Sequence, residues 1–262
     1  PIIPAMNTPR FFSPQPLSVG ARVDLSESAA RHAVRVLRLR ENDALTLFDG
    51  TGGEVSARIV QIARDAVVAE ALQRVDLERE SPVDITLVQA LQSGEKMDLT
   101  VQKAVELGVK HIVPVTSQRS VVRLEGERAQ RRVAHWQAVA VSACEQCGRN
   151  RVPEVCDLVG LRQWLARPAS GDETVRVLLD PRSLDTLDSL NPPRDGGRVE
   201  LLIGAEGGLS PEETELALRA GFNGVRMGPR VLRTETAGLA ALAVMQCLWG
   251  DFRGDAGDVR IG

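Results

Sequence analysis

Two glycine-containing loops hold the residues of this 262-residue chain that are best suited to chemistry. The first, Ile203-Gly204-Ala205-Glu206-Gly207-Gly208, follows an apolar run and precedes a helix start at residues 210–213. In open parallel sheets ligands bind beyond the carboxyl ends of the strands, where glycines let backbone groups approach closely. The loop lacks the dinucleotide and P-loop spacings, and Glu206 would repel a phosphate. The residues predict a ligand that is neutral or cationic here, with a simple tight turn as the alternative.

The second loop covers residues 227–238 and has a similar plan. Met227-Gly228-Pro229 ends a short predicted strand, and Thr234 or Thr236 lies near the start of the last helix. Ala237 and Gly238 would let another segment pack closely against that helix start. Arg230 and Arg233 are near Glu235 and could pair with it. Two such loops at neighbouring strand ends favour a binding site over two unrelated turns.

The elements that must position these loops alternate between strand and helix from residue 83 onward. Apolar runs without alternation at residues 85–90, 111–115, 175–179 and 199–203 predict strands that are buried on both faces. Helices are predicted over 95–107, 128–147 and 234–248, and another begins at Ser210 with Pro211 at its first position. The pattern predicts an α/β domain with a mostly parallel sheet over residues 83–252.

Residues 10–78 have a different rhythm of short strands. Runs rich in Val, Ile, Leu and Thr at 44–48, 54–62 and 66–72 are strand-like, and a glycine-rich turn at 49–53 joins the first two. Ser26 is the expected N-cap of one helix, whose apolar face includes Ala29, Ala33 and Leu37. We expect a small, largely antiparallel barrel, followed by a linker at 79–82. Residues 1–9 and 253–262 are expected to be a flexible N-terminus and a C-terminal tail.

The charge distribution is uneven. Lys and Arg number 32 against 35 Asp and Glu, and the net charge of −3 argues against a uniformly basic nucleic-acid binder. Two stretches are basic all the same: residues 31–40 contain Arg31, Arg35, Arg38 and Arg40 and no acid, and residues 119–132 are also net positive. Acids predominate over 180–220. Although a solvated face is the commoner meaning of one such run, two runs beside a small barrel predict a nucleic-acid surface.

Composition excludes several other classes of protein. With 43% hydrophobic and 26% charged residues the chain is a folded globular protein. Cys144 and Cys147 form a C-x-x-C, but the three histidines have no ligand spacing, so no metal site is expected. The N-terminal residues contain no secretory h-region, and the longest apolar stretch, 237–249, is too short to span a bilayer. A cytoplasmic protein is therefore expected.

The two loops together resemble the cofactor region of a known family. Residues 203–208, followed by Gly228-Pro229-Arg230-Val231-Leu232-Arg233-Thr234-Glu235-Thr236-Ala237, are similar to the RsmE family of SPOUT-class methyltransferases, which act on N3 of a uridine in small-subunit (16S) ribosomal RNA. Residues 102–109, 117–120 and 145–149 match in order, as do Arg10-Phe11-Phe12 and residues 32–38 near the N-terminus. Ala205 replaces the usual proline of the family, which should loosen the loop without removing its backbone contacts.

The resemblance implies a PUA-like β-barrel joined to a SPOUT α/β domain that contains a trefoil knot, a homodimer, and S-adenosylmethionine as cofactor. The cofactor-binding residues that it implies are Leu179, Ile203, Gly204, Glu206, Gly207, Met227, Gly228, Leu232, Thr234 and Ala237. Arg233 is the candidate catalytic residue, as a cation that stabilises charge or holds a phosphate. The implied RNA contacts are Arg10, His32, Arg35, Arg38, Arg119 and Arg149.

Three functional hypotheses result. The first is an S-adenosylmethionine-dependent rRNA uridine-N3 methyltransferase, and the second is a non-catalytic RNA-binding protein that retains the same fold. The third is a nucleotide-dependent oxidoreductase built on the glycine loop, which the missing dinucleotide fingerprint disfavours.

Overall fold

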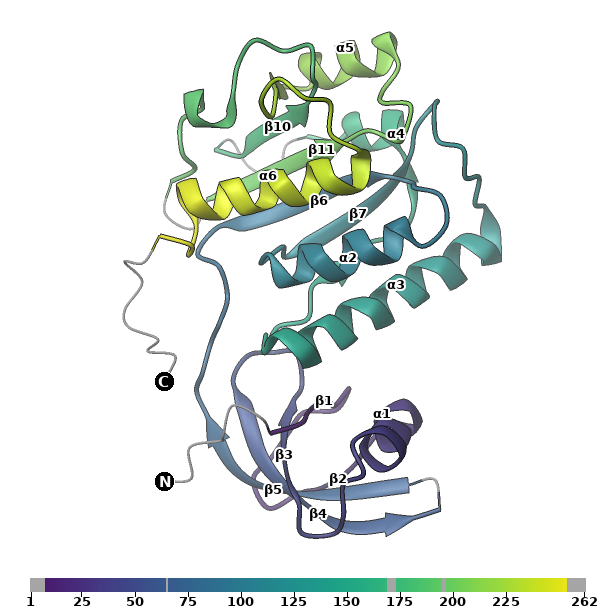
Figure 1. Cartoon of the computed structure of the whole chain (residues 1–262), viewed down its shortest axis with the longest axis vertical. Coiled ribbons are helices and arrows are strands. Elements are labelled where there is room, and N and C mark those ends of the chain that lie inside the picture. Colours follow the sequence, from purple (N-terminus) through teal and green to yellow (C-terminus); the bar gives the residue numbers. More distant parts are fainter. Residues whose placement is uncertain (1–7, 65, 169–172, 195–196, 254–262) are drawn as a thin grey trace. The chain divides into compact units, whose positions relative to one another are not determined.

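The computed structural model of the chain describes residues 8–64, 66–168, 173–194 and 197–253 (Figure 1). Its contacts divide the chain into two compact units: unit 1 contains residues 1–80 and 141–152, and unit 2 contains residues 81–140 and 153–262. The assignment of 141–152 to unit 1 was not expected from the sequence. The predicted flexible N-terminus, apart from residues 8 and 9, and the predicted tail, apart from residue 253, lie outside the described residues.

Unit 1 is built on a five-stranded sheet with the order β1-β3-β4-β5-β2. Its strands are β1 (Arg10–Phe12), β2 (Arg22–Asp24), β3 (Ala44–Phe48), β4 (Glu54–Ala63) and β5 (Ala66–Val75). The sheet is antiparallel except for β1, which pairs with β3 in parallel. The three predicted strands are confirmed, whereas β1 and β2 were not predicted as strands. The expected small, largely antiparallel barrel is thus found in the form of a curled half-barrel sheet, whose order ends at β1 and β2.

A short helix covers the apolar side of this sheet. It consists of α1 (Glu27–Arg31) and a π-helical turn, η1 (His32–Val36). Ser26 is the N-cap, as predicted: its Oγ accepts a hydrogen bond from the backbone N–H of Ala29 at 3.2 Å. Because a π-helical turn is wider than an α-helical one, the apolar face shifts after residue 32. Leu37 was expected on that face and is instead 40% exposed.

Unit 2 contains a seven-stranded sheet in which every described strand pair is parallel. The order is β12-β10-β11-β6-β7-β8, and β9 also pairs with β7. The strands are β6 (Asp84–Ala90), β7 (His111–Thr116), β8 (Glu154–Val155), β9 (Val159–Gly160), β10 (Val175–Leu179), β11 (Arg198–Ile203) and β12 (Asn223–Val225). The predicted parallel sheet is therefore confirmed.

Helices lie on both faces of this sheet, which explains why its strands are apolar without alternation. On one face α2 (Lys96–Glu106) and α6 (Thr234–Trp249) lie next to each other (Figure 1). On the other face α4 (Leu161–Leu165) and α5 (Pro211–Arg219) pack with buried residues of the central strands. The remaining helices are α3 (Gly126–Cys147), whose last seven residues belong to unit 1, and a 3-10 turn, η2 (Leu187–Ser189).

Parallel pairing brings the carboxyl ends of β6, β10, β11 and β12 to one edge of the sheet. The loops that follow these strands, including residues 91–95, 180–183, 204–210 and 226–233, therefore begin at that edge. The loop after β11 ends at a capping box: Ser210 Oγ accepts from the N–H of Glu213 at 3.1 Å, and Glu213 Oε2 accepts from the N–H of Ser210 at 3.0 Å. This box fixes the start of α5 and so the far end of the loop.

None of the helices within the described residues is both long enough and apolar enough to cross a bilayer.

Candidate functional site

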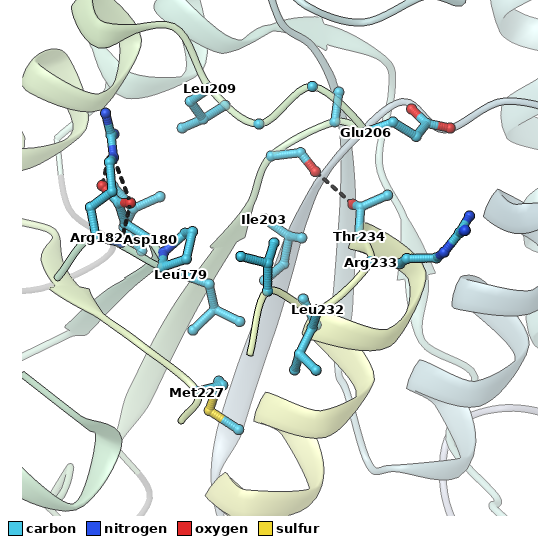
Figure 2. Close-up of a pocket in the computed structure, with 18 of the residues that line it drawn as sticks. Leu179, Asp180, Arg182, Ile203, Glu206, Leu209, Met227, Leu232, Arg233 and Thr234 are labelled. Atoms are coloured by element: carbon cyan, nitrogen blue, oxygen red, sulfur yellow. Dashed lines mark hydrogen bonds and ion pairs between the residues drawn. The ribbon is translucent and has the colours of Figure 1, made fainter. Parts of the chain in front are cut away.

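A cavity of about 580 Å³ opens at the carboxyl ends of β10, β11 and β12 (Figure 2). Its lining includes both loops that the sequence singled out. Of the ten predicted cofactor residues, nine line it: Leu179, Ile203, Gly204, Glu206, Gly207, Met227, Leu232, Thr234 and Ala237. Gly228 is not part of the lining and has a positive φ of 71°, which suits a turn after Met227. The structure thus gathers residues from three separate stretches of sequence around one space.

The loop at residues 204–208 requires glycine at its first position. A Cβ on Gly204 would lie 2.9 Å from the carbonyl carbon of Gly208 and 3.0 Å from the backbone nitrogen of Leu209. The turn is closed by the N–H of Gly208, which donates to the carbonyl of Ala205 at 2.8 Å, and Gly208 has a φ of 70°. The backbone of the loop therefore folds back on itself and lines the cavity with main-chain groups.

Glu206 holds a negative charge at this loop. Its Oε1 accepts hydrogen bonds from the N–H and the Oγ of Ser93, at 2.9 and 2.8 Å. Burial favours the neutral carboxyl, but the Ser93 hydrogen bonds and the nearby Lys96 ammonium outweigh it and hold the pKa of Glu206 below its usual value. Lys96 Nζ lies 3.8 Å from Glu206 Oε1 and 3.4 Å from Glu235 Oε1. Lys96 therefore connects the two cavity loops through their carboxylates.

Thr234, the first residue of α6, joins the two loops by a second route. Its hydroxyl donates to the carbonyl of Gly204 at 2.6 Å, the contact drawn as a dashed line in Figure 2. Its oxygen accepts from Gln89 Nε2 at 3.1 Å. Both contacts are shielded from water, since Thr234 is 7% exposed and Gln89 is fully buried.

Sequence reasoning missed an ion pair on the β10 side of the cavity. Asp180 follows β10 directly, and both of its carboxylate oxygens accept from the guanidinium of Arg182, at 3.0 and 2.9 Å. The hydrogen bonds from Arg182 hold the pKa of Asp180 below its usual value despite partial burial. The position of Asp180 at the end of a strand predicted to be buried was a signal that could have indicated it.

The predicted catalytic residue, Arg233, also lines the cavity and is exposed. Figure 2 shows its side chain pointing away from Leu179 and Ile203. Its expected partner, Glu235, forms its ion pair with Lys96. Arg233 therefore presents a cation near the opening of the cavity.

Arg119, predicted as an RNA contact, lies in the loop after β7 and touches the cavity as well. Its Nη1 donates to the carbonyl of Gly207 at 2.8 Å, and its side-chain carbons lie against the position where a Cβ of Gly207 would be, at 3.4 Å. Arg119 thus supports the glycine loop in addition to any contact with RNA.

The other predicted RNA contacts belong to unit 1 and fall into two groups. His32, Arg35 and Arg38 are exposed on η1 and just beyond it. Arg10 and Arg149 are instead enclosed in ion pairs. Arg10 Nη1 lies 2.5 Å from Glu54 Oε2, its Nη2 donates to Asn150 Oδ1 at 2.6 Å, and its side chain is 13% exposed. Arg149, 4% exposed, donates to both carboxylate oxygens of Glu80, at 3.1 and 2.5 Å.

Cys144 and Cys147 both lie near the end of α3. Burial raises the pKa of the Cys144 thiol to about 12, and the thiol donates to the carbonyl of Arg151 at 3.7 Å. Among the residues that the structure describes, His, Cys, Asp and Glu side chains nowhere gather in a group of three or more suited to a metal ion.

Comparison with known proteins places this site in a family. The sequence pattern of an RNA methyltransferase domain matches residues 79–246, and that of an RNA methyltransferase PUA domain matches residues 25–72. Ribosomal RNA small subunit methyltransferase E from Buchnera aphidicola (subsp. Schizaphis graminum) is 32% identical over 243 residues, which are 93% of this chain and 97% of the relative.

Two solved structures resemble the whole described fold. One is the ribosomal RNA small subunit methyltransferase E of Neisseria gonorrhoeae bound to S-adenosyl methionine, with 43% identity and a TM-score of 0.86, covering 94% of this chain and 100% of that one. The other is a Legionella pneumophila protein in complex with the same cofactor, with 36% identity and a TM-score of 0.88 at the same coverage. A domain match over more than half of the chain and a full-length relative above 30% identity show that this chain belongs to the ribosomal RNA small subunit methyltransferase E family of RNA methyltransferases.

Proposed function

We propose that this chain transfers a methyl group from S-adenosylmethionine to N3 of a specific uridine in 16S ribosomal RNA. The observation that carries the proposal is the cavity at the carboxyl ends of β10, β11 and β12, lined by the two family loops. Two structural relatives bind S-adenosylmethionine, and the relatives in sequence are named for methylation of small-subunit rRNA.

The residues of the cavity fit this cofactor. A carboxylate that stays ionised at Glu206 suits a sulfonium cation, and the close backbone turn at Gly204 offers main-chain groups to a polar ligand. We assign the holding of the cofactor to Leu179, Ile203, Gly204, Glu206, Gly207, Met227, Gly228, Leu232, Thr234 and Ala237. When bound, S-adenosylmethionine supplies the methyl group. The chain's own residues bind it, orient it and position the uridine, and such positioning is a large part of catalysis.

Arg233 is our candidate for a catalytic role. Loss of the N3 proton leaves negative charge that spreads over the neighbouring uracil oxygens, and a fixed cation lowers the energy of that state. Arg233 lines the cavity and its side chain is exposed, so we assign its cation to such an oxygen or to a phosphate of the RNA. The reaction yields N3-methyluridine, S-adenosylhomocysteine and one proton.

RNA is proposed to contact exposed basic residues of both units. His32, Arg35 and Arg38 form the surface on unit 1, and Arg119 contributes from the cavity of unit 2. We give Arg10 and Arg149, the two other residues implied by the family resemblance, a supporting role: their guanidinium groups hold Glu54, Asn150 and Glu80 within unit 1.

Other features are proposed on the family resemblance alone. They are a trefoil knot in the α/β domain and assembly as a homodimer. The sequence pattern is the basis for two further proposals, action in the cytoplasm and domain limits at residues 10–78 and 83–252.

The decisive experiment is methylation of 16S rRNA taken from a strain without this enzyme, followed by mass spectrometric mapping of the modified base. We expect one N3-methyluridine that depends on the protein and on S-adenosylmethionine. Folded protein that binds the cofactor but modifies no uridine would disprove the proposed reaction. Protein that binds RNA and shows no cofactor binding by calorimetry would instead be a non-catalytic RNA-binding protein.

A further inference from the structure

Four buried polar side chains lie beneath the cavity loops in unit 2. Gln89 and Thr100 are fully buried, and Gln92 and Thr234 are 3% and 7% exposed. Gln89 is in the central strand β6, between the buried apolar residues Val88 and Ala90, and Thr100 is in α2. Because burial of polar groups is unfavourable unless they are hydrogen-bonded, such a cluster in a sheet core calls for an explanation.

The hydrogen bonds of the cluster form one directed chain that ends at the cavity. Thr100 Oγ1 donates to Gln92 Oε1 at 2.9 Å, and Gln92 Nε2 donates to Thr234 Oγ1 at 3.4 Å. Gln89 Nε2 donates to the same Thr234 oxygen at 3.1 Å, and Thr234 donates its single proton to the carbonyl of Gly204 at 2.6 Å.

The direction of this chain follows from the groups involved. An amide nitrogen can only donate and a backbone carbonyl can only accept, so the Thr234 hydroxyl has one arrangement that satisfies all of its partners. The chain connects β6, α2, the start of α6 and the loop after β11.

Gln89 is costly to bury, which indicates that it has a specific task. Its Nε2 also donates to the carbonyl of Ala90 at 3.0 Å, but its Oε1 has no hydrogen-bond partner within the described residues. A Cβ on Gly238 of α6 would lie 3.5 Å from that oxygen, so α6 passes close to it. A methionine at this position would fill a similar volume without an unsatisfied acceptor.

We propose that Gln89, with Gln92 and Thr100, acts as a set of positioning residues that orient the Thr234 hydroxyl and through it fix the carbonyl of Gly204. None of these three residues belongs to the cavity lining, so they act through Thr234. Their effect is to hold the two loops in their binding arrangement before a ligand enters. If only a fraction of the molecules have the loops in the binding arrangement, the observed affinity for the ligand falls in proportion to that fraction. The inference rests on the proposed cofactor for its binding readout.

The test compares two buried glutamines of unit 2. Gln89→Met removes the donor to Thr234, and the control, Gln246→Met, removes a fully buried glutamine whose partners are Ser81 Oγ and the Leu107 carbonyl. We expect Gln89→Met to weaken S-adenosylmethionine binding, measured by calorimetry, by about tenfold, the factor given by the loss of one good hydrogen bond. Gln246→Met should bind S-adenosylmethionine with an affinity within about twofold of wild type. Its loss of thermal stability should be similar to that of Gln89→Met.

A second readout does not depend on the cofactor. Without ligand, amide hydrogen exchange over residues 204–210 should be faster in Gln89→Met than in wild type and unchanged in Gln246→Met. Failure of wild type to bind S-adenosylmethionine would refute the proposed cofactor, whereas exchange would still decide whether the loop is positioned. Equal exchange in the loop for Gln89→Met and wild type would overturn the inference.

A milder pair covers the case in which Gln89→Met does not fold. Thr100→Val keeps the shape of the side chain and removes the first donor of the chain, and Thr100→Ser restores a hydroxyl. We expect Thr100→Val to raise the KM for the cofactor with kcat nearly unchanged, and Thr100→Ser to return it toward wild type. A purely structural role would lower stability in both variants without this difference in KM, and that result would contradict positioning.

Discussion

At the residue scale, Gly204 lies where the end of β11 turns into the cavity loop, and its missing side chain determines how tightly that loop closes. The atoms that a Cβ would meet, in Gly208 and Leu209, belong to the backbone and cannot move aside as a flexible side chain could. The same residue supplies the carbonyl that Thr234 binds. One position therefore sets both the path of the loop and its attachment to α6.

Gly204→Ala should accordingly open the loop and weaken S-adenosylmethionine binding by about tenfold or more, because a clash with backbone forces a shift of the chain. The control is Gly160→Ala in β9, where an added Cβ has its nearest contact at 3.9 Å, with Thr116 Oγ1. Calorimetry of both variants checks the prediction. Equal affinities of the two variants for S-adenosylmethionine would show that cofactor binding does not need the close turn at Gly204.

The charge of Glu206 gives a prediction about pH. Its folded-state pKa lies below the usual value, so its contribution to stability is present above the unfolded pKa, about 4.3, and is lost as the pH falls through the folded value. Lys96→Met removes one of the groups that lower this pKa, and the carboxyl of Glu206 should then titrate at a higher pH. Carboxyl-carbon NMR titration measures this directly.

Lys103→Met is the matched control for Lys96→Met, because Lys103 is in the same helix and forms its ion pair with Glu106 at 2.8 Å. It should leave the titration of Glu206 unchanged. An unaltered Glu206 pKa in Lys96→Met would mean that hydrogen bonds from Ser93 and from the backbone of Glu206 itself stabilise the carboxylate without Lys96.

Individual residues were predicted well where the chemistry is local. The two loops could be found from glycines, a helix cap and a charged residue that follow apolar runs. Nine of the ten residues predicted to bind the cofactor line one cavity. Their contact with the cofactor stays a prediction. Gln89 and Asp180 were missed because their roles depend on hydrogen-bond partners. Gln89 meets Thr234 only through the fold, and Asp180 meets Arg182 only through a loop turn. Arg149 looked like a free basic residue for the same reason: Glu80 is 69 positions away.

At the element scale, α5 shows how a short helix fixes a loop. Besides its capping box with Ser210, Glu213 accepts from the N–H of Gln118 at 2.7 Å through its other oxygen and is 1% exposed. The carboxylate thus joins the start of α5 to the loop after β7. Sequence predicted the cap from Ser-Pro-Glu-Glu, but could not predict the bond to Gln118, which depends on where the β7 loop passes.

Ser210→Ala should lower the free energy of unfolding by about 1 kcal/mol, the usual effect of losing an N-cap. Chemical denaturation measures the change. Ser142→Ala, at an exposed position within α3, provides the comparison and should not destabilise the protein, because alanine is the better helix former. Similar losses in both variants would show that the capping box contributes little.

At the scale of the whole molecule, the modest net charge conceals a separation of basic and acidic stretches along the sequence. Arg35→Gln and Arg38→Gln should each weaken RNA binding and reduce the slope of log affinity against log salt by about 0.7 to 0.9. Arg149→Gln should leave the slope unchanged and instead destabilise the protein by about 3 kcal/mol, because it removes the buried partner of the largely enclosed Glu80 carboxylate. Binding titrations at several salt concentrations, with thermal melting, distinguish these effects. An unchanged slope in the double variant Arg35→Gln/Arg38→Gln would exclude this surface.

The division into two parts was visible in the sequence as a change from short strands to alternating strands and helices near residue 80. The return of residues 141–152 to unit 1 was not visible, because periodicity reports only local pattern and α3 runs without interruption from residue 126 to 147. Likewise, runs rich in Val, Ile, Leu and Thr predicted three strands in unit 1, whereas the parallel pairing of β1 with β3 depends on residues far apart in the chain.

This discontinuity has a consequence for synthesis on the ribosome. Residues 1–80 leave the ribosome first, yet Glu145, which accepts from the N–H of Phe12 at 3.0 Å, and Asn150 and Arg149, the partners of Arg10 and Glu80, follow more than sixty positions later. Until residue 152 has emerged, the edge strand β1 and the charges of Arg10 and Glu80 lack these partners. Unit 1 is therefore encoded first but completed only after roughly the first third of unit 2 has been translated.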